Sequence, residues 1–145
     1  MSTRQVAAPF REAMPGDISV YDVEGDLTTL EYCFVELDTA RARTVKAYAG
    51  GIATGVLCNR PIEDGTSTQF STEALVQTKG KALVKAGSGA LTPGQLVKVG
   101  TGGVGDAATP SDGDIIVGQC EVGAAAGLPA TVRLFGGPVY VSIPE

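Results

Sequence analysis

Short runs in which apolar and polar residues alternate follow one another from residue 31 onward. The run Thr44-Val45-Lys46-Ala47-Tyr48-Ala49 places Val45, Ala47 and Ala49 on one face of an extended chain. Comparable short runs recur at 32–37, 52–57, 74–77, 82–85, 96–99, 115–117, 131–135 and 139–143. Short strands at regular spacing, separated by glycine-rich turns, predict an all-β fold, either a small β-barrel or a sandwich.

Two turns and one loop are predicted between these runs. Lys79-Gly80-Lys81 separates runs 74–77 and 82–85, which predicts a hairpin. Pro93 and Gly94 suit the second and third positions of a turn, because proline fixes φ and glycine accepts a positive φ. We expect this structural turn to lead into the run 96–99. The stretch 100–114 shows no periodicity and is predicted to be a long surface loop.

Residues 1–30 differ in texture from the rest of the chain. They are polar, and prolines and glycines interrupt them. Their apolar residues stand isolated, at Phe10, Met14, Ile18 and Tyr21. We predict an extended N-terminal arm over 1–30, followed by one folded domain over 31–145. Such an arm is either a terminus without a role or a segment ordered by lying on a partner, and the repeated apolar residues favour the second.

Composition limits the core and the partners. The chain has 145 residues, 43% of them hydrophobic, but no Trp and only 6% aromatic residues. The core must therefore consist of Val, Leu, Ile and Ala, and we expect subunit contacts to supply part of the stability. The net charge of −5 and the pI near 4.7 argue against a general nucleic-acid-binding protein, which needs a basic surface.

The charge is distributed in three blocks. Residues 1–40 and 99–145 carry an excess of acids, whereas residues 41–98 carry an excess of bases. Two interpretations stay open. The blocks are solvated strand faces, or the basic middle of the chain meets an acidic partner.

The glycine run from Gly100 to Gly105 has the spacing of a dinucleotide-binding turn, G-x-G-x-x-G. That turn must open into a helix, whose N-terminal amides hold the pyrophosphate. Here Pro110 and Gly113 would interrupt the helix, and Asp106 would place a negative charge beside the phosphate. We therefore predict a glycine-rich turn with no nucleotide cofactor.

Residues for catalysis or metal binding are equally sparse. The chain has no histidine, which removes the common nucleophile–histidine arrangements, and Gly87-Ser88-Gly89 lacks the spacing of a nucleophile elbow. The three cysteines, Cys33, Cys58 and Cys120, lack zinc-ligand spacing and are expected to be buried thiols in a reducing compartment. We predict no catalytic residue, no metal site, no cofactor and no small-molecule substrate, so that the protein is not an enzyme. No signal peptide or membrane-spanning run is evident, so we expect synthesis in the cytoplasm and no membrane partner.

Several stretches between residues 50 and 135 follow one theme. It consists of a strand, a small-residue turn ending in Pro-Gly, a polar loop, an Ile-Gly step and a closing Val-Arg-Leu strand. The stretches are Gly50–Val56, Glu73–Gly80, Val84–Val99, Ile115–Glu121, Gly127 and Thr131–Leu134. In this theme the chain resembles the head decoration, or capsid cement, proteins of tailed bacteriophages. It departs from the family pattern at Gln95, where an acid is common, and at Val117, which stands inside the Ile-Gly step.

The resemblance implies a β-barrel or tulip-like domain on the outer surface of a virion. It implies a homo-oligomer, often a trimer, that binds the major capsid protein and stabilises the expanded shell by bridging its subunits. The N-terminal arm would reach across the shell, with Phe10, Met14, Ile18 and Tyr21 as its capsid contacts. The alternative that remains is a β-barrel interaction module of a phage tail, baseplate or cell surface.

Overall fold

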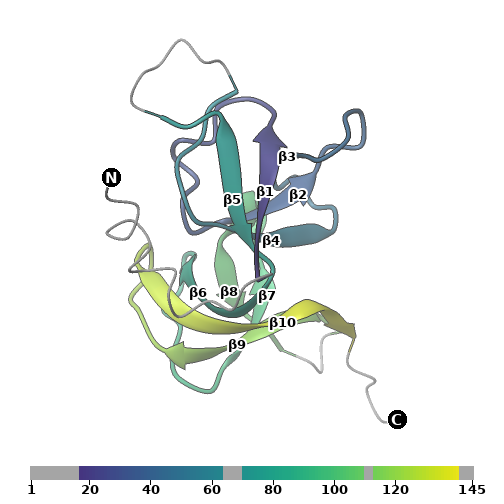
Figure 1. Cartoon of the computed structure of the whole chain (residues 1–145). Coiled ribbons are helices and arrows are strands. Elements are labelled where there is room, and N and C mark those ends of the chain that lie inside the picture. Colours follow the sequence, from purple (N-terminus) through teal and green to yellow (C-terminus); the bar gives the residue numbers. More distant parts are fainter. Residues whose placement is uncertain (1–16, 64–69, 110–112, 141–145) are drawn as a thin grey trace.

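Two stacked β-sheets form the molecule in the computed structural model, which describes residues 17–63, 70–109 and 113–140 (Figure 1). The first sheet closes into a barrel with the strand order β1-β3-β2-β4-β5. Its strands are β1 (Ile18–Val23), β2 (Phe34–Leu37), β3 (Thr44–Ala47), β4 (Ala53–Leu57) and β5 (Glu73–Gln77). The predicted all-β fold with a small barrel is therefore confirmed.

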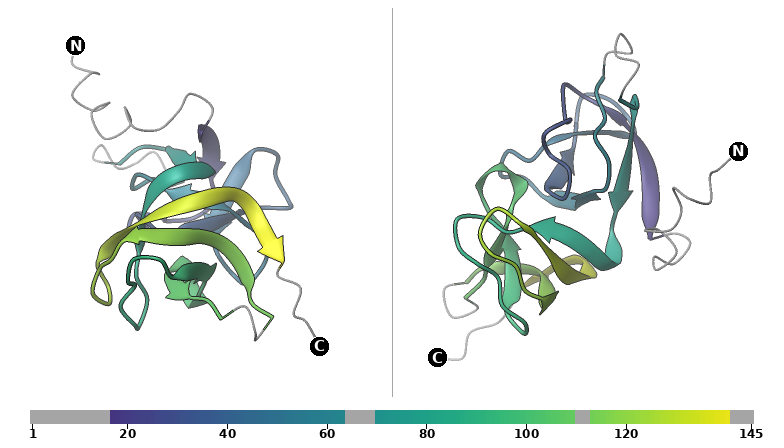
Figure 2. Two further views of the ribbon diagram at one scale, coloured as in Figure 1. Left: turned by 90° about the horizontal axis from the view of Figure 1, so that it is seen from below. Right: turned by 90° about the vertical axis from the view of Figure 1, so that its left-hand side faces the viewer.

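The second sheet has five strands in the order β6-β10-β9-β7-β8 and lies against one end of the barrel (Figure 2). Its strands are β6 (Lys79–Lys85), β7 (Leu96–Val99), β8 (Gly105–Ala107), β9 (Ile115–Val122) and β10 (Pro129–Tyr140). A single turn of 3₁₀ helix, η2 (Thr101–Gly103), stands between β7 and β8. No helix within the described ranges is long and apolar enough to cross a membrane.

The barrel is closed by β1, which lies inside the segment that was expected to be an arm. From Ile18 to Asp22, β1 pairs antiparallel with β5, and at Asp22 and Val23 it pairs parallel with β3. Residues 18–23 therefore belong to the folded domain, which was expected to begin only at residue 31. Sequence pattern missed this strand because only one of its faces packs on the core and both of its partners are distant in the chain. Phe10 and Met14 lie outside the described residues.

The predicted hairpin around Lys79-Gly80-Lys81 is wrong. β5 and β6 are separated only by Thr78, yet they belong to different sheets: β5 pairs with β1 and β4, and β6 pairs with β10. The chain thus crosses from the barrel to the second sheet at Thr78. Alternating residues predict strands, but they do not reveal which strand is the partner.

Neighbouring residues of β2 point to opposite layers and join the two cores. Val35 is buried in the barrel cluster, together with Val45, Leu57 and Val76. Phe34 is instead buried in the second cluster, which is built mainly from β6, β7, β9 and β10. Because successive side chains of a strand alternate in direction, β2 contributes to both cores.

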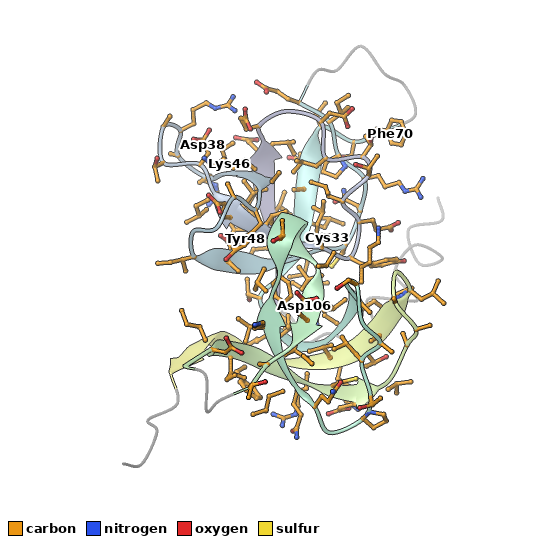
Figure 3. The ribbon with its side chains drawn as sticks, turned by 180° about the vertical axis from the view of Figure 1, so that it is seen from behind. Cys33, Asp38, Lys46, Tyr48, Phe70 and Asp106 are labelled. Carbon is orange, nitrogen blue, oxygen red and sulfur yellow. The ribbon has the colours of Figure 1, made fainter. Side chains whose placement is uncertain are left out.

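The glycine run from Gly100 to Gly105 forms the turn of the β7–β8 hairpin, which lies at the edge of the second sheet and reaches to the barrel (Figure 3). The run leads into β8 and not into the α-helix that a nucleotide-binding turn requires. Gly103 has a φ of +89° and packs its Cα against the carbonyl oxygen of Phe34. The part of the predicted loop 100–114 that is described is therefore a strand and a docking turn.

The turn at Pro93 and Gly94 is present. Gly94 has a φ of +90°, and the Gln95 amide donates to the Thr92 carbonyl at 3.2 Å. The Gly94 amide also donates to the Cys120 carbonyl at 2.8 Å, which ties the turn to β9.

Charged side chains pair between the three blocks of the sequence. The pairs that join a base of residues 41–98 to an acid of a flanking block are Arg41–Asp38, Lys46–Glu36, Arg60–Glu31, Lys79–Asp17, Lys81–Glu121 and Lys98–Asp114. This cross-matching favours solvated, paired strand faces over one basic face for an acidic partner.

The cysteines are free thiols. Cys33 and Cys120 are buried and Cys58 is partly buried. Burial raises the pKa of Cys58 to about 11, which keeps this thiol protonated and unreactive.

Candidate functional site

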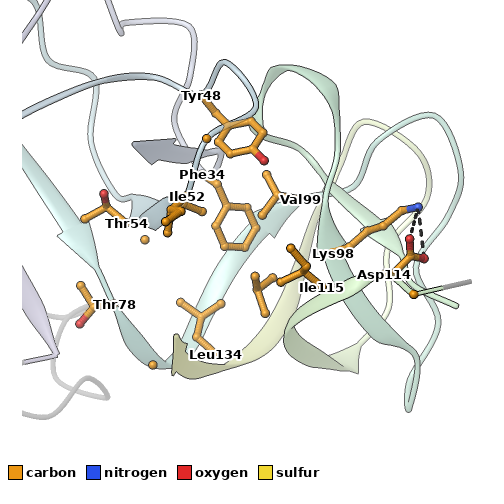
Figure 4. A pocket seen from close by; sticks show the side chains of 16 residues that line it. Phe34, Tyr48, Ile52, Thr54, Thr78, Lys98, Val99, Asp114, Ile115 and Leu134 are labelled. Atoms are coloured by element: carbon orange, nitrogen blue, oxygen red, sulfur yellow. Dashed lines mark hydrogen bonds and ion pairs between the residues drawn. The ribbon is translucent and has the colours of Figure 1, made fainter. Parts of the chain in front are cut away.

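A cleft of about 350 Å³ lies where the barrel meets the second sheet (Figure 4). Phe34 of β2 forms its centre, with Leu134 of β10 and Val99 of β7 beside it. The other lining residues are Tyr48, Gly51, Ile52, Ala53, Thr54, Gly55, Thr78, Lys98, Gly113, Asp114, Ile115, Val117 and Gly136. The cleft therefore draws on both sheets and is mostly apolar.

Ile52 stands on the rim of the cleft with 76% of its surface exposed. Its loop is held in shape by Glu36, whose Oε1 accepts from the Ala49 amide at 2.8 Å and from the Gly51 amide at 3.0 Å. The bond from Ala49 is the main cause that lowers the pKa of Glu36, with Gly51 and the Lys46 charge adding to it. An ionised carboxylate thus fixes a loop that presents an apolar side chain to solvent.

Three ionisable side chains line the cleft: Tyr48, Lys98 and Asp114. Lys98 Nζ and Asp114 Oδ2 form an ion pair at 3.3 Å at one end of the cleft. Asp114 also accepts from the Thr109 amide at 2.8 Å, and this bond lowers its pKa, with a further contribution from Lys98. Both charges are engaged with each other, so the arrangement suits the binding of an apolar group better than proton transfer.

Metal binding has no evident place in the described part of the chain, since no group of three or more His, Cys, Asp or Glu side chains gathers there.

The opposite end of the cleft lies where β1 begins. The Asp17 carbonyl accepts from the Thr78 amide at 2.7 Å and from Thr78 Oγ1 at 3.2 Å. Thr78 lines the cleft, and so does Gly136, which lies against the Lys79 side chain. The described chain thus starts at an end of the cleft.

The predicted contact residues of the arm separate in the structure. Tyr21 is half-buried and packs against the barrel cluster. Ile18 lies on the outer face of β1, as does Val20, which is 41% exposed and pairs with Leu75 of β5. Ile18, Val20 and Leu75 form an apolar row on the outside of the barrel, which we call the β1/β5 face.

Sequence reasoning did not find the cleft or Val20. The cleft combines residues from β2, β4, β7, β9 and β10, and no local pattern shows that these strands converge. The signal that was available is Ile52, an isolated bulky residue directly after Gly50 and Gly51.

The fold and the cleft define the class of this protein as a two-sheet β domain with a closed barrel. No family model matches the chain, and no curated protein matches it in sequence. A solved structure with a similar fold is the head fiber gp8.5 N base of bacteriophage phi29. The two share 12% sequence identity and a TM-score of 0.59, over 84% of this chain and 96% of that one.

Proposed function

We propose that the protein is a structural component of a bacteriophage virion that attaches to the outer surface of the head. The observation that carries the proposal is the likeness of its fold, over 84% of the chain, to the base of a phage head fiber. The strand-and-turn theme of residues 50–135 supports it independently, because this theme resembles head decoration proteins. The partner would be the major capsid protein, and each copy would bridge neighbouring shell subunits.

The β1/β5 face is our candidate for the capsid contact. Val20 leaves 41% of its surface exposed in the middle of this row, and residues 1–16 are joined directly to it. Exposed apolar rows of this kind are typical of protein-interaction surfaces. Phe10 and Met14, which precede the row in sequence, stay predicted capsid contacts.

The work of such a protein is mechanical, and we propose that it has no catalytic activity. Contacts repeated over many copies stabilise the shell even when each contact is weak. The cleft supports this view, because its two charged side chains neutralise each other.

The test is co-sedimentation of the pure protein with expanded, empty heads of the phage that encodes it. The wild type should sediment with the heads. Val20→Asp should weaken binding at least about tenfold, because a buried valine contributes roughly 1.5 kcal/mol or more. The matched control is Leu37→Asp, since Leu37 is also an exposed apolar residue on a barrel strand, at 49% exposure.

Two results would contradict the proposal at different levels. If the wild type does not sediment with heads, the attachment itself is wrong, and a tail, baseplate or cell-surface partner has to be sought. If Leu37→Asp weakens binding and Val20→Asp does not, attachment holds but the β1/β5 face is the wrong surface.

A further inference from the structure

The cleft lies open at the point where the chain enters the barrel, and this raises the question of what occupies it. Phe34 is itself buried at the floor of this cleft, whereas Ile52 on its rim is 76% exposed, so the water-facing apolar surface of the cleft lies at its rim. Such a surface favours an apolar occupant. The residues next to the cleft in the sequence are residues 1–16, which lie outside the described ranges and which we call the N-terminal segment.

Chain connectivity brings the N-terminal segment to the cleft. The two bonds from Thr78 to the Asp17 carbonyl, at 2.7 and 3.2 Å, fix residue 17 beside a lining residue. Lys79 Nζ lies 3.9 Å from Asp17 Oδ1, and Lys79 packs against Gly136, the lining residue on the other side of this end. Residue 17 is therefore fixed beside Thr78 at this end of the cleft.

The barrel sheet leaves room for an extended segment at this end. β4 pairs with β2 from Ala53 to Val56, but it pairs with β5 only at Val56 and Leu57. After Gln77 the chain departs toward β6, so β5 does not continue beside Ala53 and Thr54, which both line the cleft. Within the described residues, this part of the β4 edge faces the cleft, and an added strand could pair with it.

The composition of the N-terminal segment suits this position. It contains the apolar run Val6-Ala7-Ala8-Pro9-Phe10. Pro9 biases Ala8 toward extended conformations, as a groove-bound strand requires. Phe10 precedes Asp17 by seven positions, a reach of up to about 24 Å. Phe10 is the single aromatic residue of the segment, and an aromatic ring buries a large apolar surface when it enters a pocket.

We propose that in the unattached protein the cleft is the binding site of the chain's own N-terminal segment, with the Phe10 side chain inserted beside Phe34. This goes beyond attachment to a head, because it concerns an intramolecular site. The segment would lie along the β4 edge and cover the apolar lining from Thr78 toward Ile52.

Tryptophan fluorescence tests the proposal on the full-length chain, which has no native Trp. Phe10→Trp provides a single reporter. Leu37→Trp provides an exposed reference, since Leu37 is 49% exposed and does not line the cleft. We expect the emission of the Phe10→Trp variant to be blue-shifted and less quenched by acrylamide than that of the reference.

A second substitution then tests whether the Trp at position 10 is buried in the cleft. Adding Ile52→Asp to Phe10→Trp should shift the emission toward that of the exposed reference, because the charge disrupts the cleft rim. Adding Leu37→Asp, at an exposed site outside the cleft, should leave the emission unchanged. Circular dichroism should give the wild-type spectrum for both double variants, which checks that they keep the fold.

Three results would overturn the proposal. The emission of the Phe10→Trp variant could equal that of the exposed reference, or stay blue-shifted in the Ile52→Asp background, which would place Phe10 elsewhere. It could also depend on protein concentration, which would mean that a second copy provides the cleft. No heads are present in this experiment, so its failure leaves the proposed attachment untouched, and failed co-sedimentation leaves the cleft assignment untouched.

Discussion

Single glycines decide how closely the two sheets approach. Gly103 lies directly on the Phe34 carbonyl with a φ of +89°, a conformation that side chains with a Cβ rarely adopt. Gly87 and Gly100 likewise allow the Asp106 carboxylate to lie against their Cα atoms. The glycine run that resembles a nucleotide-binding turn is thus explained by packing between β2 and the β7–β8 hairpin.

Gly103→Ala should reduce the free energy of unfolding by more than about 3 kcal/mol. The positive φ alone costs a residue with a Cβ about 1–2 kcal/mol. The new methyl group would in addition overlap the Phe34 carbonyl oxygen, a backbone atom that cannot rotate away. Urea denaturation followed by circular dichroism measures the loss.

The neighbouring glycine separates the two causes. Gly102 has a φ of +79°, but a Cβ there would meet no atom within 4 Å. Gly102→Ala should therefore cost only about 1–2 kcal/mol, the conformational part. Equal losses in the two variants would show that the contact with Phe34 contributes nothing.

Local structure could be predicted from the sequence where the backbone preference of a residue type determines it. Pro93 and Gly94 form the predicted turn because their φ preferences fit it, and the chain after Gly100 forms a single 3₁₀ turn and β8, not the α-helix that a nucleotide-binding turn needs. The orientation of Tyr21 could not be predicted. It packs against the barrel cluster because β1 is a barrel strand, and that depends on partners far along the chain.

At the scale of elements, most strands were predicted from alternation, but their partners were not. The runs 96–99 and 52–57 coincide closely with β7 and β4. The pairing of β5 and β6 was mistaken because a change of sheet at Thr78 leaves the alternation intact on both sides. Pairing depends on non-local contacts such as β6 with β10, which a single sequence does not reveal.

The crossing from β5 to β6 is stabilised by one buried amide. Gln77 is 5% exposed, and its Nε2 donates to the Lys79 carbonyl at 3.0 Å and to the Lys81 carbonyl at 2.6 Å. Both carbonyls belong to β6, an outer strand of its sheet. The side chain therefore caps an edge that would otherwise be open to another strand.

Gln77→Met should lower the free energy of unfolding by about 1–3 kcal/mol, because it removes both donors while keeping the length of the side chain. Gln119→Met is the matched control, since its bond to the Gly94 carbonyl is exposed to solvent and should contribute under about 1 kcal/mol. Chemical denaturation of both variants gives the comparison. If Gln119→Met lowered the free energy of unfolding as much as Gln77→Met, the buried hydrogen bonds of Gln77 would contribute no more than an exposed one.

At the scale of the whole molecule, the candidate site is a property of topology. Phe34 could be predicted to be buried, since it lies in an apolar run, but not to face a second sheet. Ile52 lines the cleft together with residues of β9 and β10, which lie far along the chain. The sequence could therefore indicate an all-β binding protein, while the cleft and the β1/β5 face required the arrangement of both sheets.

An exposed apolar row at one end of the second sheet bears on the predicted oligomer. Thr131 of β10 pairs with Leu83 of β6 and with Val122 of β9, which are 44% and 59% exposed. Leu128, just before β10, is 57% exposed. A core without Trp gains stability when such a row is covered by another copy of the chain.

We therefore expect the urea midpoint of the wild type to rise with protein concentration, because unfolding would also dissociate the subunits. Each association step adds about 1.4 kcal/mol per tenfold concentration, so a trimer, with two steps, would gain about 2.8 kcal/mol per trimer and a dimer half as much. Val122→Asp should flatten this dependence by placing a charge in the row. Leu37→Asp, on the barrel, should leave it intact. A wild-type midpoint that is independent of concentration, together with a monomer mass in sedimentation equilibrium, would show that the free protein is stable alone and that neighbouring copies meet only on the head.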